Sequence, residues 1–261
     1  MPEPNGGPGP GPGPGTALRD LRARFLAVRR LLDRVTDRDL DLPTPAAGWA
    51  VRHQIAHLAD TEEVAADTVR DGPRAFARAV APYASAEDFT AAGVAAAVDA
   101  DRDALVARLC RAQDATLAAL AEVDPEHRVP WGLGLSARTF AQARLMESWA
   151  HGWDVATALR LPERLDADCW HVAALGHATL RFALRRARVP VPRGRTLRLE
   201  LDAGPHGRWT FGPEDATDLL TGPALAWVKT ATRRDADRAR RLLRAEGPLA
   251  ELAATHAQAY L

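Results

Sequence analysis

Apolar residues recur at helical spacing through the first part of the chain. Between residues 16 and 35 they follow one another at intervals of three and four, so they form one stripe along a helix. The same spacing predicts long helices over residues 51–70, 101–123 and 136–159. The stretch 72–100 is weakly patterned, and we interpret it as a loop with some short helix. Four long amphipathic helices in one segment favour a four-helix bundle.

The pattern changes after residue 161. A helix is predicted over 168–186, and the segment TLRLELDAG then alternates apolar and polar residues, as a half-buried strand does. The segment RWTFG is its expected hairpin partner, and ARRLLRAEG can form a third strand. Two more helical stretches are expected near 223–232 and 248–259.

These patterns divide the chain into three parts. Residues 1–15 are mostly proline and glycine, which bury no apolar area, so we expect a disordered tail. A four-helix-bundle domain is expected over residues 16–161, and a smaller α+β domain over residues 162–261. The predicted fold class is therefore mainly α.

The composition excludes several classes of function. The chain has 34 basic and 34 acidic residues, so it lacks the positive charge that nucleic-acid or anionic-membrane binding requires. It has no apolar run long enough to span a bilayer. Its two cysteines, Cys110 and Cys169, exclude a disulfide scaffold and favour a reducing, cytoplasmic location.

Two of the predicted helices contain groups of metal-ligating residue types. One carries His53 and His57 in VRHQIAHLADTE, and another carries Glu147, His151 and Asp154 in MESWAHGWDVA. Residues four apart share a helix face, so Glu147 and His151 can reach one point, and His57 from the opposite helix can supply a third ligand. Two histidines and one carboxylate with an open position are typical of catalytic zinc. The same donors suit non-haem iron, and the HExxH motif of metalloproteases is absent.

Spacing alone leaves other interpretations of these residues open. Glu147 and His151 can be a surface pair, and His57 can be a hydrogen-bonded core histidine. His53 can be a solvated histidine, a fourth ligand or a partner that orients a ligand. Asp154 can orient a ligand histidine or lie on the surface.

Two longer motifs make the sequence recognisable. PTPAAGWAVRHQIAHLADTE, followed later by ARLMESWAHGWDVATAL, resembles the DinB-like metal-binding superfamily. Within it, the chain is similar to the mycothiol-dependent maleylpyruvate isomerase branch, which includes actinobacterial metal-binding proteins. The resemblance implies a DinB-like bundle whose metal ligands are His57, Glu147 and His151. Where relatives often have an acidic residue, this chain has His53.

The resemblance also implies a chemistry. We expect a divalent metal, zinc first, with iron, nickel or manganese as alternatives, and mycothiol as co-substrate. A metal favours the thiolate form of a thiol. The expected function is that of a thiol-dependent isomerase or S-transferase acting on a small electrophilic or unsaturated metabolite. The alternatives are a metalloenzyme of natural-product biosynthesis that uses no thiol, and a metal-binding protein without catalysis. The expected state is a monomer or homodimer.

Further residues are candidates for the pocket and for catalysis. Trp149 and Trp153 lie on the predicted metal helix and can wall the pocket, although ordinary bundle packing is the better explanation for at least one of them. Trp131 precedes that helix and can line the mouth. Arg144 lies one turn before the first metal ligand and can pair with a substrate carboxylate. Together with Asp154 and His53, it completes the set of catalytic candidates.

Overall fold

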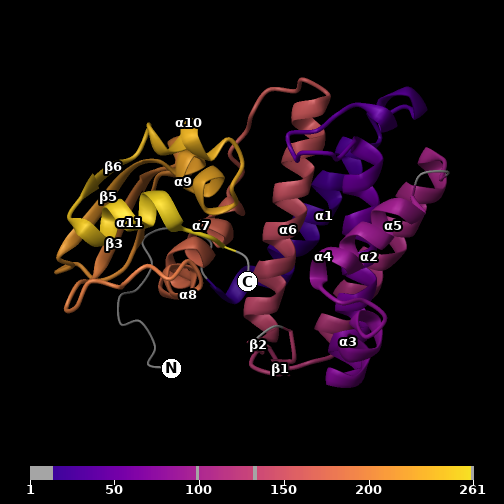
Figure 1. Cartoon of the computed structure of the whole chain (residues 1–261), viewed down its shortest axis with the longest axis horizontal. Coiled ribbons are helices and arrows are strands. Elements are labelled where there is room, and N and C mark those ends of the chain that lie inside the picture. Colours follow the sequence, from indigo (N-terminus) through magenta and orange to yellow (C-terminus); the bar gives the residue numbers. More distant parts are fainter. Residues whose placement is uncertain (1–13, 98–99, 132–133, 260–261) are drawn as a thin grey trace. The chain divides into compact units, whose positions relative to one another are not determined.

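The structure is a computed structural model that describes residues 14–97, 100–131 and 134–259 (Figure 1). The predicted tail over 1–15 lies, apart from its last two residues, outside this range. The described chain is mainly α, as predicted, with a helical bundle and a smaller α+β part. Its contacts divide it into two compact units, of which one spans 17–163 and the other contains the residues from 164 onward. In the described part, no helix is both long and apolar enough to cross a membrane.

The first unit is built on four long helices whose apolar stripes face one another. Phe25, Ile55, Leu109 and Leu145, one from each helix, are fully buried between them. Burial of these stripes, more than helix propensity, stabilises helices of this length. The long helices are α1 (Ala17–Leu32), α2 (Val51–Asp71), α5 (Arg102–Ala121) and α6 (Ala137–Ala158).

The segment 72–100 is more helical than the weak pattern predicts. It contains α3 (Pro73–Val80) and α4 (Ala86–Ala96). Ser85 caps α4 by accepting a hydrogen bond from the backbone N–H of Asp88 at 3.0 Å. Helix α4 is difficult to predict from the sequence, because its small residues form no strong apolar stripe.

Short elements complete the connections within this unit. Before α6, the connector forms a two-stranded antiparallel ladder, and the loop that follows α1 contains one turn of 3₁₀ helix. These elements are β1 (Arg128–Val129), β2 (Leu135–Ser136) and η2 (Asp37–Asp41).

The second unit contains a four-stranded sheet in the order β4-β3-β5-β6. Strands β3 and β4 form the predicted hairpin, and β6 is the third predicted strand. Its strands are β3 (Leu197–Asp202), β4 (Arg208–Phe211), β5 (Asp218–Pro223) and β6 (Arg244–Glu246). Its helices are α7 (Cys169–Ala178), α8 (Leu180–Arg186), α9 (Ala224–Ala231), α10 (Ala236–Arg240) and α11 (Pro248–His256).

Two features of this unit differ from the prediction. The helix expected over 168–186 is interrupted at Thr179, whose hydroxyl oxygen lies 2.7 Å from the carbonyl oxygen of Leu175 and 2.6 Å from that of Gln258. Strand β5 was not predicted, although it lies inside the sheet and pairs in parallel with β3. Its sequence DLLTGP has too few alternating residues to stand out, and its pairing with β3 is non-local.

Asp218, the first residue of β5, joins the sheet to α11. Its side chain is fully buried, and Oδ2 accepts a hydrogen bond of 2.6 Å from the backbone N–H of Leu249 in the first turn of α11. Oδ1 accepts from Thr217 at 2.8 Å and from Arg195 at 3.1 Å. Burial raises the pKa of Asp218, but these hydrogen bonds outweigh it, so the pKa lies below its usual value.

We predict that Asp218→Asn lowers the free energy of unfolding by about 1–3 kcal/mol at pH 7, because it weakens buried charge-assisted hydrogen bonds. Because the folded-state pKa is lowered, this stabilisation is complete above the unfolded-state pKa of about 3.9. It is lost as the pH falls through the folded-state value.

Urea unfolding of both proteins between pH 7 and pH 3 measures the difference. Asp215→Asn, in the exposed turn before the same strand, is the matched control and should match the wild type. A difference that stays constant down to pH 3, or that is absent at pH 7, would contradict this role of Asp218.

Candidate metal centre

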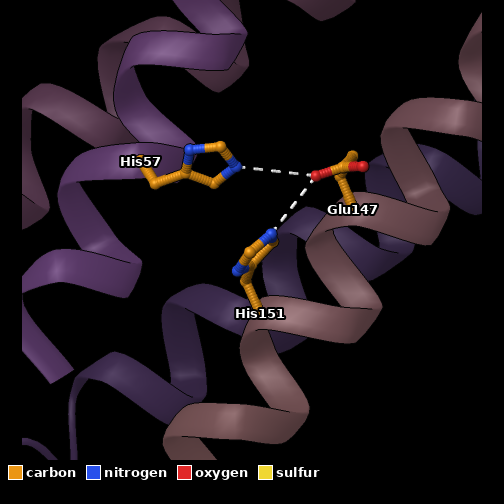
Figure 2. A group of neighbouring side chains, drawn as sticks. All are labelled: His57, Glu147 and His151. Atoms are coloured by element: carbon orange, nitrogen blue, oxygen red, sulfur yellow. Dashed lines mark ion pairs between the residues drawn. The ribbon is translucent and has the colours of Figure 1, made fainter. Parts of the chain in front are cut away.

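The centre lies between α2 and α6, which pack side by side in the bundle. Helix α2 contributes His57, and α6 contributes Glu147 and His151, four residues apart on one face. Figure 2 shows the two imidazole rings directed at the carboxylate of Glu147. The Nε2 atom of His57 lies 3.7 Å from Glu147 Oε2, and His151 Nε2 lies 3.3 Å from the same oxygen.

The three side chains form a compact donor set that solvent can reach. One ligand atom from each lies within 4.8 Å of the other two. The side chains of His57, Glu147 and His151 keep 13%, 22% and 12% of their surface exposed. Two imidazole nitrogens and one carboxylate oxygen fit a divalent metal such as zinc, with a further coordination position left for solvent or substrate.

The electrostatics of the centre keep its carboxylate in the ligand form. Burial raises the pKa of Glu147, but the contacts with His151 and His57, and the charge of Arg144, hold that pKa well below its usual range. The carboxylate is therefore ionised at neutral pH, as metal ligation requires.

The side chain of Arg144 forms hydrogen bonds with other residues of the bundle. It is buried, and its Nε donates to Glu62 Oε1 at 3.0 Å, while Nη2 donates to Thr61 Oγ1 at 3.0 Å. Its guanidinium carbon lies 5.6 Å from the centre of the Trp131 ring. The sequence made Arg144 a candidate partner of a substrate carboxylate. In the structure its partner is Glu62, and the pair joins α2 to α6 one turn before Glu147.

His53 lies at the beginning of α2 and outside the three-residue group. Its Nδ1 accepts a hydrogen bond of 3.0 Å from the backbone N–H of Ala50, so the ring caps the helix. Burial lowers the pKa of His53. Asp154 is buried on α6, and its Oδ2 lies 4.0 Å from His151 Nδ1. Its predicted role in orienting His151 fits this position and stays a prediction.

The three predicted pocket tryptophans differ in burial. Trp149 is buried in the bundle, whereas Trp153 and Trp131 are half-buried. The Trp131 ring packs at 5.3 Å from that of Phe140. Their role as pocket walls stays a prediction.

Sequence reasoning missed the side chains that contact the ligand histidines. The ring of Trp49 lies edge-on to His57 at 5.2 Å and is stacked on His151 at 6.0 Å with an interplanar angle of 24°. Gln54 Oε1 lies 2.5 Å from His151 Nδ1. The sequence could have indicated Trp49, because the Gly-Trp pair before α2 belongs to the motif that resembles the family. The sequence indicates Gln54 more weakly, as a polar residue one turn before His57.

Comparison with known proteins places this chain in a family. Residues 18–156 match the mycothiol maleylpyruvate isomerase N-terminal domain. Two uncharacterized proteins, from two strains of Mycobacterium tuberculosis, are each 37% identical to the chain over 202 residues, which cover 74% of this chain and 76% of theirs.

Two solved structures share the fold. One is the mycothiol-dependent maleylpyruvate isomerase, with a TM-score of 0.57, 19% identity, and coverage of 85% of this chain and 90% of that chain. The other is a mutant of that enzyme, with a TM-score of 0.59, 18% identity, and coverage of 90% and 95%. The match over residues 18–156, which is more than half of the chain, shows that the chain belongs to the mycothiol maleylpyruvate isomerase N-terminal domain family.

Proposed function

We propose that the chain is a metal-dependent enzyme that uses a low-molecular-weight thiol. The observation that carries the proposal is the convergence of His57 Nε2, Glu147 Oε2 and His151 Nε2 at a partly exposed point between two helices. Three protein ligands and one open position are the arrangement of catalytic zinc sites, whereas structural zinc sites use four protein ligands. The family supports mycothiol as the thiol.

Each part of the donor set has its own task in this proposal. A divalent metal held there supplies stabilisation of a thiolate, which is the nucleophilic form of a thiol. Glu147 contributes the negative charge, and the two histidines contribute neutral nitrogens. Trp49 packs against both imidazoles.

The thiolate supports two reactions on a small electrophilic or unsaturated metabolite. Reversible addition of the sulfur to an activated double bond permits rotation and gives cis–trans isomerisation. Displacement of a leaving group by the sulfur gives S-transfer. Both reactions need the same deprotonated thiol, so the donor set serves either one. The names of the structural neighbours favour the isomerase.

We predict that the purified protein binds about one divalent metal ion per chain, as a single three-ligand site requires. His57→Ala and Glu147→Ala should each lose most of it, because two remaining ligands hold a metal weakly. Elemental analysis after dialysis measures the metal content and identifies the ion among zinc, iron, nickel and manganese. His127→Ala, at an exposed histidine of the same unit, is the matched control and should keep its metal. Full retention in the His57 and Glu147 variants would refute the site.

We further predict that the metal-loaded protein, incubated with mycothiol, isomerises maleylpyruvate or converts a model electrophile into its thioether. The reaction should require both the thiol and the metal, and Glu147→Ala should be inactive. Chromatography with mass detection distinguishes the two products. Turnover without thiol would favour the thiol-free metalloenzyme, and metal binding without any turnover would favour the non-catalytic protein.

A further inference from the structure

Gln54 connects the metal centre to the loop that precedes α2. It lies on α2 one turn before His57, and its side chain is fully buried. Its Oε1 lies 2.5 Å from His151 Nδ1, and its Nε2 donates to Thr44 Oγ1 at 2.9 Å. A buried amide with a partner at each end is held in one orientation.

The orientation of Gln54 follows from the hydrogen bonds of Thr44. The Thr44 hydroxyl has one proton, which it donates to the backbone carbonyl oxygen of Trp49 at 2.9 Å, because a carbonyl oxygen can only accept. Toward Gln54 the hydroxyl can therefore only accept, so the amide nitrogen faces Thr44. The amide oxygen then faces His151, and it requires a proton on Nδ1.

The position of this proton decides what His151 offers to the centre. With a proton on Nδ1, the neutral ring has its lone pair on Nε2. That atom lies 3.3 Å from Glu147 Oε2, with His57 Nε2 3.7 Å from the same oxygen. Electron-rich atoms this close repel one another unless a proton or a cation lies between them. The Asp154 carboxylate, 4.0 Å from His151 Nδ1, favours the same proton position.

The same loop also restrains the plane of the ring. A bridge between Pro43 and Ala50 closes the loop, and the N–H of Thr44 donates to the Trp49 carbonyl oxygen at 2.8 Å. The Trp49 ring is stacked on His151. One short loop thus supplies both the hydroxyl that orients Gln54 and the ring that packs on the imidazole.

We propose that Gln54, oriented by Thr44, is a positioning residue that fixes His151 in the Nδ1-protonated tautomer, so that Nε2 is its metal-binding atom. The role in metal binding rests on the proposed function, whereas the tautomer is a property of the metal-free chain. Partners of this kind for ligand histidines change metal affinity by roughly 10–100-fold when they are removed.

The tautomer is tested by ¹⁵N NMR of the histidine rings in metal-free protein at neutral pH, with the His151 signals assigned from His151→Gln. The wild type should show a proton on Nδ1 and none on Nε2. In Gln54→Leu, which has no acceptor, the Nε2-protonated form should appear. A proton on Nε2 in the wild type would overturn the proposal, and so would an unchanged tautomer in Gln54→Leu.

Zinc affinity, measured by competition with a chelating dye, tests the consequence for binding. Gln54→Leu should bind zinc roughly 10–100-fold more weakly than the wild type. Thr44→Val, a milder change, should weaken it less, and Gln54→Glu, which keeps an acceptor oxygen, should restore most of it. Gln113→Leu is the matched control, because Gln113 is equally buried but bonds to Arg29 on α1. Wild-type affinity in both Gln54→Leu and Thr44→Val would overturn the role in binding.

These two readouts separate this proposal from the proposed function. If the wild type binds no zinc, the metal-dependent function fails, and the tautomer in the metal-free chain still decides the role of Gln54. If the wild type binds zinc and the Gln54 variants bind it equally well, the function stands and the positioning role fails. Circular dichroism of each variant checks that the bundle is folded.

Discussion

The candidate site depends on three electron-rich atoms that two helices hold within 4.8 Å of one another. The four-residue spacing on α6 sets one pair of atoms, and the packing of α2 against α6 sets the third. An ionised carboxylate facing two imidazole nitrogens is stable only with a proton or a cation among them. The buried pair of Arg144 and Glu62 joins the two helices nearby, although burial raises the pKa of Glu62 more than its contacts with Arg144 lower it. The contacts around the three side chains then determine whether a proton or a cation lies between the carboxylate and the imidazoles.

The surroundings of the three candidate ligands favour the cation. In the proposed tautomer, Gln54 and Thr44 direct the proton of one imidazole away from the carboxylate. The three candidate ligands remain partly exposed, so solvent can reach them. A purely structural site would bury its ligands and supply a fourth one. The geometry of the three side chains is therefore that of an open metal site, as the proposed function requires.

The sequence predicted the features that depend on local spacing. Apolar residues three and four apart revealed the four long helices, and the spacing within MESWAHGWDVA identified two of the three residues that the structure brings together. Features that depend on contacts between distant segments escaped prediction. Strand β5 is recognisable only beside β3, and Gln54 resembles an exposed polar residue until α6 is packed against it. Likewise, the sequence around Arg144 does not indicate that it pairs with the buried Glu62, 82 positions away.

The most direct test of the account is X-ray absorption spectroscopy of the zinc-loaded protein with and without mycothiol. We expect nitrogen and oxygen ligands alone in the thiol-free protein, with the signature of two imidazoles. Adding the thiol should introduce one sulfur ligand at about 2.3 Å, the usual zinc–sulfur distance. A zinc ion with four protein ligands, or one that acquires no sulfur from saturating thiol, would contradict an open three-ligand centre built for thiol chemistry.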